Sequence, residues 1–471
     1  MSKENKHLYT LKIDQTTGTI DEEMWSDEYN KVNYSDENFT LDFELREDDT
    51  YCMEIFSAKD NLVLPTHFLG KPIVEIAFSV EGKCENVKTI LIPEGVKAIC
   101  GQSFAFFCSL ESLEIPDSVE KIYSCAFEGC EKLKYIKLPK NIKFIAGGLF
   151  HSCRSLETIE IPSRVCIIED EAFRGCENLK SLFIPKSVEK IGEDVFFITP
   201  SLERIDVDFE NNYFKSIDGN LYTKDGKVLI RYCPKRTDKE FIIPNGVEII
   251  EYNAFQDAKN LKKITLCDSL KTVKESAFAY CENLEEIYIS QNTQFSSFAF
   301  RNCKKLKKFN VDLNNPYYTC VDDNLYSKDG KTLIYYALGK DVLEYSIPKG
   351  TTKIAEGAFC GSKLKKIVLC EDIKKLDTGA ICVCDDLEEI VLCENLEEID
   401  NCAICVKNLK SIIIPKNVKL IDDYAFTGCD LLKNITVDEN NLYYKDVDGV
   451  LYTKDGKTRV HYPEGKFMDL E

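Results

Sequence analysis

An apolar residue followed by proline returns at a fixed interval between residues 92 and 185. Five such pairs lie 23 residues apart without a slip: Ile92-Pro93, Ile115-Pro116, Leu138-Pro139, Ile161-Pro162 and Ile184-Pro185. A unit of this length is too short to bury an apolar side alone and must stack on its neighbours. The period therefore predicts a solenoid, a fold that presents long continuous surfaces and usually holds other molecules.

Each repeat unit predicts a short strand, a turn and a second apolar wall. Residues 133–138 read Leu-x-x-Ile-x-Leu, an alternation typical of a strand with one buried face. The proline that follows cannot donate to a ladder and ends the strand. Val119 and Ile122 predict the opposite wall, and Ala126-Phe127-x-x-Cys130 fits a single helical turn with the ring inside. Stacked units would pair their strands in parallel, about 4.8 Å apart.

The strand motif can be counted along most of the chain. It gives 15 strands, ending near Ile92, Ile115, Leu138, Ile161, Ile184, Val207, Ile243, Leu266, Ile289, Val311, Ile347, Leu369, Leu392, Ile414 and Val437. The intervals are 22 or 23 residues, except for two of 36. These long units, at about 208–243 and 312–347, each contain Lys-Asp-Gly-Lys, which we expect to form a hairpin turn because Asp-Gly suits paired positive φ angles.

Three regions follow from this count. Residues 1–64 lie outside the period, and alternating apolar residues in them predict an N-terminal β cap. Residues 65–437 form the repeat array, which begins with an imperfect unit at 65–76. Residues 438–471 contain a third copy of the hairpin text with no strand after it. We expect this copy to cap the open edge of the sheet, which would otherwise favour aggregation.

The unit Ile-Pro-x-x-Val-x-x-Ile-x-x-x-Ala-Phe-x-x-Cys-x-x-Leu closely resembles BspA-like (Treponema-type) leucine-rich repeats, as does the Asp-Gly-x-Leu-Tyr-x-Lys-Asp-Gly insert. The resemblance covers about residues 65–471. It implies an α/β leucine-rich-repeat solenoid: a right-handed curved superhelix with a parallel sheet on one face, short helical or irregular turns on the other, and β-hairpin insertions. It also implies roles in adhesion and protein–protein contact, commonly at bacterial or protist surfaces, and no catalytic residues.

The charge of the chain restricts its partners and its location. Sixty basic and 80 acidic residues give a net charge of −20, which repels phosphate backbones and anionic headgroups. We therefore expect neither nucleic-acid binding nor membrane insertion. Residues 1–13 lack the apolar core of a signal peptide, and no run approaches the ~20 apolar residues of a membrane span. The expected location is the cytoplasm, and the family resemblance leaves the cell surface as the alternative.

Most of the 22 cysteines fall in repeat columns. Eight occupy one position, three residues before the residue that opens a strand: Cys84, Cys130, Cys153, Cys176, Cys281, Cys303, Cys384 and Cys429. A small apolar thiol that fills one slot in each unit explains all eight. The 22 cysteines make up about 4.7% of the 471 residues, which is below the 8–10% typical of short disulfide scaffolds. We therefore expect buried thiols in a reducing compartment.

A denser cysteine group offers the sharpest alternative. It comprises Cys360, Cys370, Cys382, Cys384, Cys393, Cys402 and Cys405. Cys402-x-x-Cys405 has the spacing of zinc ligands, but a single pair is a weak signal. In the repeat register, Cys360, Cys382 and Cys405 share one column, and Cys370 and Cys393 share another. We favour column filling and predict no metal or cofactor, with a redox pair or a metal site as the alternatives.

Nothing in the sequence assembles a catalytic group. The four histidines, His7, His67, His151 and His461, are far apart, and a solenoid cannot bring distant units together. No nucleophile and base can be paired, no glycine-rich phosphate loop is present, and the carboxylates follow outward positions. The chain is therefore predicted not to be an enzyme.

The outward side chains of the strands are the candidate binding site. We predict that a protein partner docks on this face, at Phe183, Asp206, Tyr288, Val368, Val391 and Ile413. Exposed aromatic and contiguous apolar residues are enriched at interfaces, although β-branched residues also simply suit an open sheet. The prediction is a scaffold that is monomeric or self-associates weakly. The alternatives are a self-assembling surface or coat protein, and a thiol redox or metal-binding protein.

Overall fold

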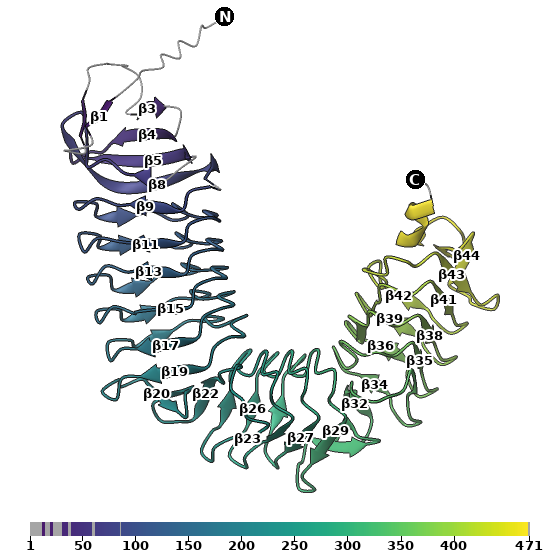
Figure 1. The fold of residues 1–471 in the computed structure, drawn as a ribbon. Coiled ribbons are helices and arrows are strands. Elements are labelled where there is room, and N and C mark those ends of the chain that lie inside the picture. Colours follow the sequence, from purple (N-terminus) through teal and green to yellow (C-terminus); the bar gives the residue numbers. More distant parts are fainter. Residues whose placement is uncertain are drawn as a thin grey trace, which may run out of the picture. The chain divides into compact units, whose positions relative to one another are not determined.

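The structure is a computed structural model, and it describes residues 12–14, 19–21, 31–35, 39–58, 62–84 and 86–469. Two compact units divide the chain: unit 1 comprises residues 1–226 with 230–236, and unit 2 comprises residues 227–229 with 237–471. Both are built from stacked coils, each corresponding to one sequence repeat (Figure 1). The chain is thus a parallel β-solenoid, as the period predicts.

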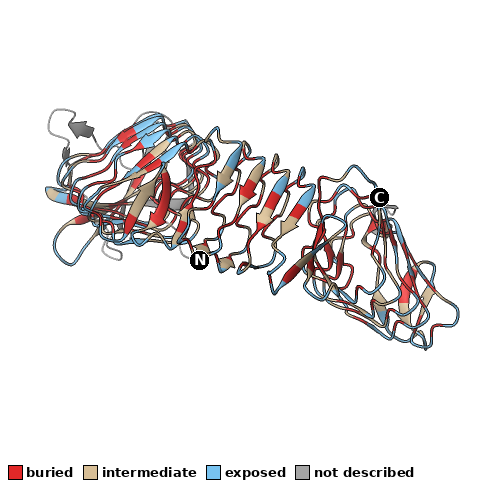
Figure 2. Ribbon diagram, turned by 90° about the horizontal axis from the view of Figure 1, so that it is seen from below, coloured by how far each residue is buried: buried red, intermediate tan, exposed pale blue. Residues whose placement is uncertain are grey.

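The repeat strands of unit 1 follow the sequence motif. They are β9 (Thr89–Leu91), β11 (Ser112–Glu114), β13 (Tyr135–Lys137), β15 (Thr158–Ile159), β17 (Ser181–Ile184) and β19 (Arg204–Val207). They form two parallel ladders, β9-β11-β13 and β15-β17-β19. Pairing is shifted by one repeat, so that Leu113 pairs with Ile90 on one side and Ile136 on the other. These central residues are buried and their neighbours along the strand are exposed, an alternation that Figure 2 shows.

A second wall of two-residue strands closes each coil of unit 1. These strands are β10 (Ala98–Ile99), β12 (Lys121–Ile122), β14 (Phe144–Ile145), β16 (Ile167–Ile168) and β18 (Lys190–Ile191). Their buried residues include Ile122, Ile145 and Ile168. The Val-x-x-Ile pattern therefore builds the opposite wall, as predicted.

The turn that carries the alanine–phenylalanine pair is irregular rather than helical. Two left-handed residues bracket the pair, for example Cys125 (φ 58°) and Gly129 (φ 69°). An α-helix cannot continue through such residues. The backbone donors of the turn instead reach the next coil: the amide of Phe127 donates to the carbonyl of Leu149 at 3.1 Å. Among the described residues the one helix is η1 (Glu464–Asp469), of 3₁₀ type.

The buried rings stack from coil to coil in the centre of unit 1. Phe104, Phe127, Phe150 and Phe173 have ring centroids 5.6, 5.9 and 5.6 Å apart, with planes within 9° of parallel. All four rings are fully buried. The inner wedge that the sequence predicts is therefore a continuous column, which makes each coil depend on its neighbours for burial.

Among the residues that the structure describes, eight strands precede the first repeat strand of unit 1. They are β1 (Lys12–Asp14), β2 (Thr19–Asp21), β3 (Lys31–Ser35), β4 (Phe39–Leu45), β5 (Tyr51–Ala58), β6 (Leu62–Val63), β7 (His67–Phe68) and β8 (Lys71–Lys83). β8 pairs in parallel with both β5 and β10, and β6 pairs in parallel with β9. The N-terminal strands therefore continue both walls of the coils.

Unit 2 repeats the same architecture. Its repeat strands are β23 (Glu240–Ile242), β25 (Lys263–Thr265), β27 (Glu286–Ile289), β29 (Lys308–Val311), β33 (Glu344–Ser346), β35 (Lys366–Val368), β38 (Glu389–Val391), β41 (Ser411–Ile414) and β43 (Asn434–Val437). With the six of unit 1, all fifteen strands counted in the sequence are present.

The second wall of unit 2 matches that of unit 1. It consists of β24 (Ile249–Ile250), β26 (Thr272–Val273), β28 (Gln294–Phe295), β34 (Lys353–Ile354), β36 (Lys375–Leu376), β39 (Glu398–Ile399) and β42 (Leu420–Ile421). A separate two-stranded sheet lies at the turns where isoleucine replaces phenylalanine: β37 (Ile381–Cys382) and β40 (Ile404–Cys405) pair there in parallel.

Three hairpin inserts share one design. They comprise β20 (Phe214–Ile217), β21 (Asn220–Thr223) and β22 (Val228–Arg231); β30 (Tyr318–Val321), β31 (Asn324–Ser327) and β32 (Thr332–Tyr335); and β44 (Tyr444–Val447), β45 (Val450–Thr453) and β46 (Arg459–His461). In the Lys-Asp-Gly-Lys turns only the glycine has positive φ. Paired positive φ angles occur one turn earlier, for example at Asp218 and Gly219. That earlier loop has two residues, as in a type I′ hairpin.

Candidate functional site

Outward side chains of three strands in unit 2 form an apolar row. Val368 of β35 and Val391 of β38 are direct neighbours in the parallel ladder, and β41, which carries Ile413, lies beside β38. Ile413 is 66% exposed and Val391 is 37% exposed, whereas Val368 is half-buried. We name these three residues the apolar ridge. Three of the predicted site residues therefore lie together.

Ion pairs border the apolar ridge on β35 and β38 and at the residues just before these strands. Lys366, two residues before Val368, places its Nζ 2.8 Å from Glu389 Oε1. Lys365 Nζ lies 2.8 Å from Glu388 Oε1. Exposed pairs of this kind contribute little to stability. Their position instead gives the apolar ridge a polar rim, an arrangement typical of protein interfaces.

Tyr288 lies in another row of unit 2. It neighbours Thr265 in the ladder, and Thr265 neighbours Ile242. The hydroxyl of Tyr288 donates to Asp312 Oδ2 at 2.8 Å, and this hydrogen bond raises the pKa of the tyrosine. Ile242 is exposed but absent from the predicted set. The Ile243-Pro244 pair marks the end of its strand, so the outward position of Ile242 could have been read from the sequence.

The two predicted residues of unit 1 are ladder neighbours. Phe183 pairs with Asp206 across β17 and β19. Phe183 is 52% exposed, and Asp206 Oδ1 lies 2.6 Å from Arg204 Nη2. Charged residues occupy the same outward position on earlier strands, among them Glu114 and Lys137. Phe183 therefore has an acidic neighbour in its row and does not belong to an extended apolar row like that of unit 2.

The inserts display apolar side chains that sequence reasoning missed. Each insert has an exposed tyrosine close in sequence to a strongly exposed apolar residue. We name these pairs the insert tips: Phe209 (87% exposed) with Tyr213, Leu313 (92%) with Tyr317, and Leu442 (76%) with Tyr443. The recurring Asn-x-Tyr-[Phe/Tyr] text marks the position of the tips. It does not say which side chain points outward.

A buried asparagine fixes each insert tip. Asn211 Nδ2 donates to the carbonyls of Pro185 and Val188, both at 2.9 Å. Its Oδ1 accepts from the amides of Tyr213 and Phe214, both at 2.8 Å. Asn441 makes the same four bonds in the third insert. The tips are therefore exposed apolar groups on a fixed backbone.

The cysteine column is buried, as predicted. All eight thiols of the shared position are inaccessible. Those of Cys130 and Cys153 donate to carbonyls of the preceding coil, both at 3.1 Å. Burial raises the pKa of Cys429 to about 12. A thiol that stays protonated is a poor nucleophile and a poor metal ligand, so the column has a packing role.

The dense cysteine group of unit 2 also follows the coil register. Cys382 and Cys405 are ladder partners. Cys370 and Cys393 each donate to a carbonyl, at 3.2 and 3.1 Å. Burial raises the pKa of Cys393 to about 11. The Cys402-x-x-Cys405 pair is half-buried and forms no cluster of three metal-ligating residues within the described part of the chain.

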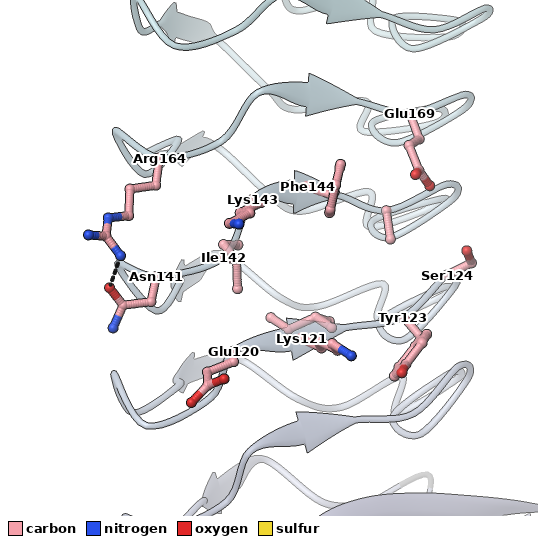
Figure 3. A pocket seen from close by; sticks show the side chains of 12 residues that line it. Glu120, Lys121, Tyr123, Ser124, Asn141, Ile142, Lys143, Phe144, Arg164 and Glu169 are labelled. Carbon is pink, nitrogen blue, oxygen red and sulfur yellow. Dashed lines mark hydrogen bonds between the residues drawn. The ribbon is translucent and has the colours of Figure 1, made fainter.

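A surface groove of about 830 Å³ lies along the second wall of unit 1. Figure 3 shows its charged lining, including Lys121, Lys143, Glu120 and Glu169. Arg164 donates to Asn141 Oδ1 at 3.2 Å across one end of the groove. No histidine or cysteine lines it, so it contains no nucleophile–base pair of the common types.

The histidines with described positions stay apart, as predicted. His151 lies 3.4 Å from Glu128 Oε1, His67 contacts Thr66, and His461 packs edge-on against Phe426. His7 lies outside the described residues.

One cluster of potential metal ligands occurs among the described residues: Cys52, Glu75 and Cys100, all half-buried. Sequence reasoning missed it. Cys52 and Glu75 are 23 residues apart, so extending the period into the N-terminal region would place them on neighbouring strands. A hydrogen bond between the two thiols lowers the pKa of Cys100 and raises the pKa of Cys52. Both thiols are half-buried, unlike those of the buried column.

No helix among the described residues has the length and apolar character needed to cross a membrane. No curated protein matches the sequence. A similar solved structure is a leucine-rich cell surface protein from Faecalibacterium prausnitzii: 26% identity over 76% of this chain and 94% of that one, with a TM-score of 0.52.

Two further solved structures are similar at lower identity. A leucine-rich repeat protein from Eubacterium ventriosum shares 21% identity, with coverage of 90% and 100% and a TM-score of 0.47. The pneumococcal vaccine antigen PcpA shares 19% identity, with coverage of 88% and 95% and a TM-score of 0.45. The model of the BspA type leucine-rich repeat region matches residues 4–120, 102–224, 232–328 and 335–446. The chain therefore belongs to the BspA-type leucine-rich repeat family.

Proposed function

We propose that this protein is a non-catalytic scaffold that binds another protein on its exposed strand face, with the apolar ridge as the centre of the site. The observation that carries the proposal is the run of outward apolar side chains on three neighbouring strands, ending at Ile413 with 66% of its surface exposed. An isoleucine exposed to water contributes no hydrophobic stabilisation to the folded protein. A partner that covers it removes its apolar surface from water, and this burial contributes to the free energy of binding.

The surroundings of the apolar ridge support a docking role. The Lys366–Glu389 pair lies beside it on the same strands, so the site has an apolar centre and a charged rim. The ridge also lies on ladder strands, so little conformational entropy would be lost when a partner binds.

The test compares capture of binding proteins by three forms of the full chain. The Val391→Lys, Ile413→Lys double variant places two charges on the apolar ridge. Ile242→Lys is the matched control, because Ile242 is also exposed on a unit 2 strand but lies outside the ridge. We expect wild type and control to retain a partner that the double variant loses, with unchanged melting temperatures. Retention by the double variant would contradict the proposal.

The location belongs to the same proposal. All 22 cysteines are free, which suits a reducing compartment, and we propose that the protein functions in one. The Faecalibacterium relative is a cell surface protein, and this makes the surface the competing location. Alkylation of thiols in intact source cells with a membrane-impermeant reagent separates the two, since only surface protein would be labelled at the exposed Cys320.

The insert tips favour a second candidate, self-assembly. Phe209 and Leu313 are almost fully exposed, and their backbone is fixed by buried asparagines. Light scattering across a concentration series tests this candidate. Assembly through the tips predicts that the mass of the wild type rises with concentration. The Phe209→Asp, Leu313→Asp variant should remain a monomer at every concentration. A wild type that is monomeric throughout the series would exclude it.

A further inference from the structure

A cluster of two thiols and a carboxylate lies on three neighbouring strands near the N-terminus of unit 1. Cys52 of β5 and Glu75 of β8 are ladder partners. Glu75 is also the partner of Ala98 on β10. Cys100 comes two residues after Ala98, and its amide donates to the carbonyl of Ile76 at 2.8 Å. Since side chains alternate along a strand, all three functional groups lie on one face of the sheet.

The side-chain atoms of this cluster converge. One atom from each of Cys52, Glu75 and Cys100 lies within 4.8 Å of the other two, and Cys100 Sγ lies 4.0 Å from Glu75 Oε2. Each residue is half-buried, which leaves a path from solvent. Arg46 forms an ion pair with Glu75 and fixes its carboxylate.

This geometry suits a bridging ion better than a disulfide. β8 lies between the two strands that place the cysteines, and two strand spacings amount to about 9.6 Å. A disulfide needs Cα atoms about 4.4–6.8 Å apart. Two sulfurs on one tetrahedral ion, at bonds of about 2.3 Å, are about 3.8 Å apart. Because the sulfurs of Cys52 and Cys100 already lie within 4.8 Å of each other, one ion can join the two cysteines across β8 after a small shift of the side chains.

We propose that Cys52, Cys100 and Glu75 bind a thiophilic divalent cation of the Zn²⁺ class. Two S–H bonds break, two sulfur–metal bonds form, and both protons pass to solvent. Two thiolates, one carboxylate, the dication and Arg46 sum to zero charge. Arg46 acts as the outer partner that orients the ligating carboxylate. The ion would join three strands at the start of the array, and water would occupy the remaining position.

The experiment is a Co²⁺ titration of the reduced full chain, read by the thiolate-to-cobalt charge-transfer absorption. Wild type is expected to bind one Co²⁺ through thiolates and to lose the absorption when Zn²⁺ is added. Cys52→Ser and Cys100→Ser are expected to abolish the signal. Glu75→Gln should weaken binding at least about tenfold. Far-ultraviolet circular dichroism establishes that each variant is folded.

Cys402→Ser is the matched control, because it removes a half-buried cysteine from the Cys-x-x-Cys pair whose spacing alone suggests zinc. This variant should titrate like wild type. Absence of a thiolate signal in wild type overturns the proposal. So does a signal that survives in both Cys52→Ser and Cys100→Ser, or one that only Cys402→Ser removes.

Discussion

The left-handed position at the end of each repeat turn shows how single residues adapt to the coil. Gly129, Ser152, Gly175 and Ile198 occupy the same place in successive coils, with φ between 56° and 73°. Glycine adopts this conformation freely, whereas a β-branched side chain is strained in it. The column therefore contains both the residue that suits the geometry best and one that suits it poorly.

We predict that Ile198→Gly raises the free energy of unfolding. Relief of the left-handed strain amounts to about 1–2 kcal/mol, and the extra freedom of glycine in the unfolded chain offsets about 0.4–1 kcal/mol of this. Urea denaturation measures the difference. Gly175→Ala is the converse variant and should be destabilising, because its Cβ would lie 3.3 Å from Ser152 at a φ of 73°. Destabilisation by Ile198→Gly would show that packing of the isoleucine outweighs the strain.

His461 predicts a pH dependence for the last insert. Burial lowers its pKa, against a weaker opposing effect of a backbone hydrogen bond with Asp423. As pH falls through about 6.5, the unfolded state binds a proton that the folded state does not, so stability falls until the lower folded pKa is reached. Melting temperatures at about pH 7.5 and about pH 5.5 measure this loss, which should be smaller in His461→Gln. An equal loss in both proteins would assign the pH dependence to other groups.

At the scale of the element, the inserts depend on one side chain each. Asn211 joins two carbonyls of the preceding coil to two amides of its own loop. We predict that Asn211→Ala lowers the free energy of unfolding of unit 1 by about 1–3 kcal/mol, since buried backbone groups lose their partners. Asn212→Ala is the control, because this neighbour is exposed. Equal urea midpoints for the two variants would contradict the anchoring role.

The strands were predictable from sequence and the turns were not. Apolar alternation locates every repeat strand, because the buried face of a strand follows from residue types. Proline follows eight of the fifteen and marks their ends, because it cannot donate to the ladder. The left-handed pairs that bracket Ala126-Phe127 carry no such mark, since Cys125 occupies one of the positions. The spacing of alanine, phenylalanine and cysteine suits a helical turn as well as the irregular turn that is present. The irregular turn forms because its backbone amides donate to the next coil, and this pairing is not visible in the sequence.

The candidate sites divide in the same way. Val391 and Ile413 were predictable because the outward position of a strand follows from its inward one. The insert tips required the direction of a loop. Prediction of the Cys52–Glu75–Cys100 cluster required the pairing of β5 with β8, and no proline motif marks these two strands.

For the whole molecule, the state of the cysteines is the broadest test. Thirteen of the 22 are buried and only Cys320 is exposed. We predict that few thiols react with Ellman's reagent in the native protein and that all 22 react in denaturant without reductant. Cys320→Ser should remove one thiol from the fast-reacting set. A denatured count well below 22 would instead reveal disulfides and support the redox alternative.

The constant register between coils gives the protein an adjustable length. Excision of residues 139–161 would join Leu138 directly to Pro162 and leave the strand, ring and thiol columns in step. Copying the same segment would lengthen the face by one strand spacing, about 4.8 Å. A gene that encodes such a chain can therefore be resized by unequal recombination, in whole coils, to match the dimensions of whatever it has to span.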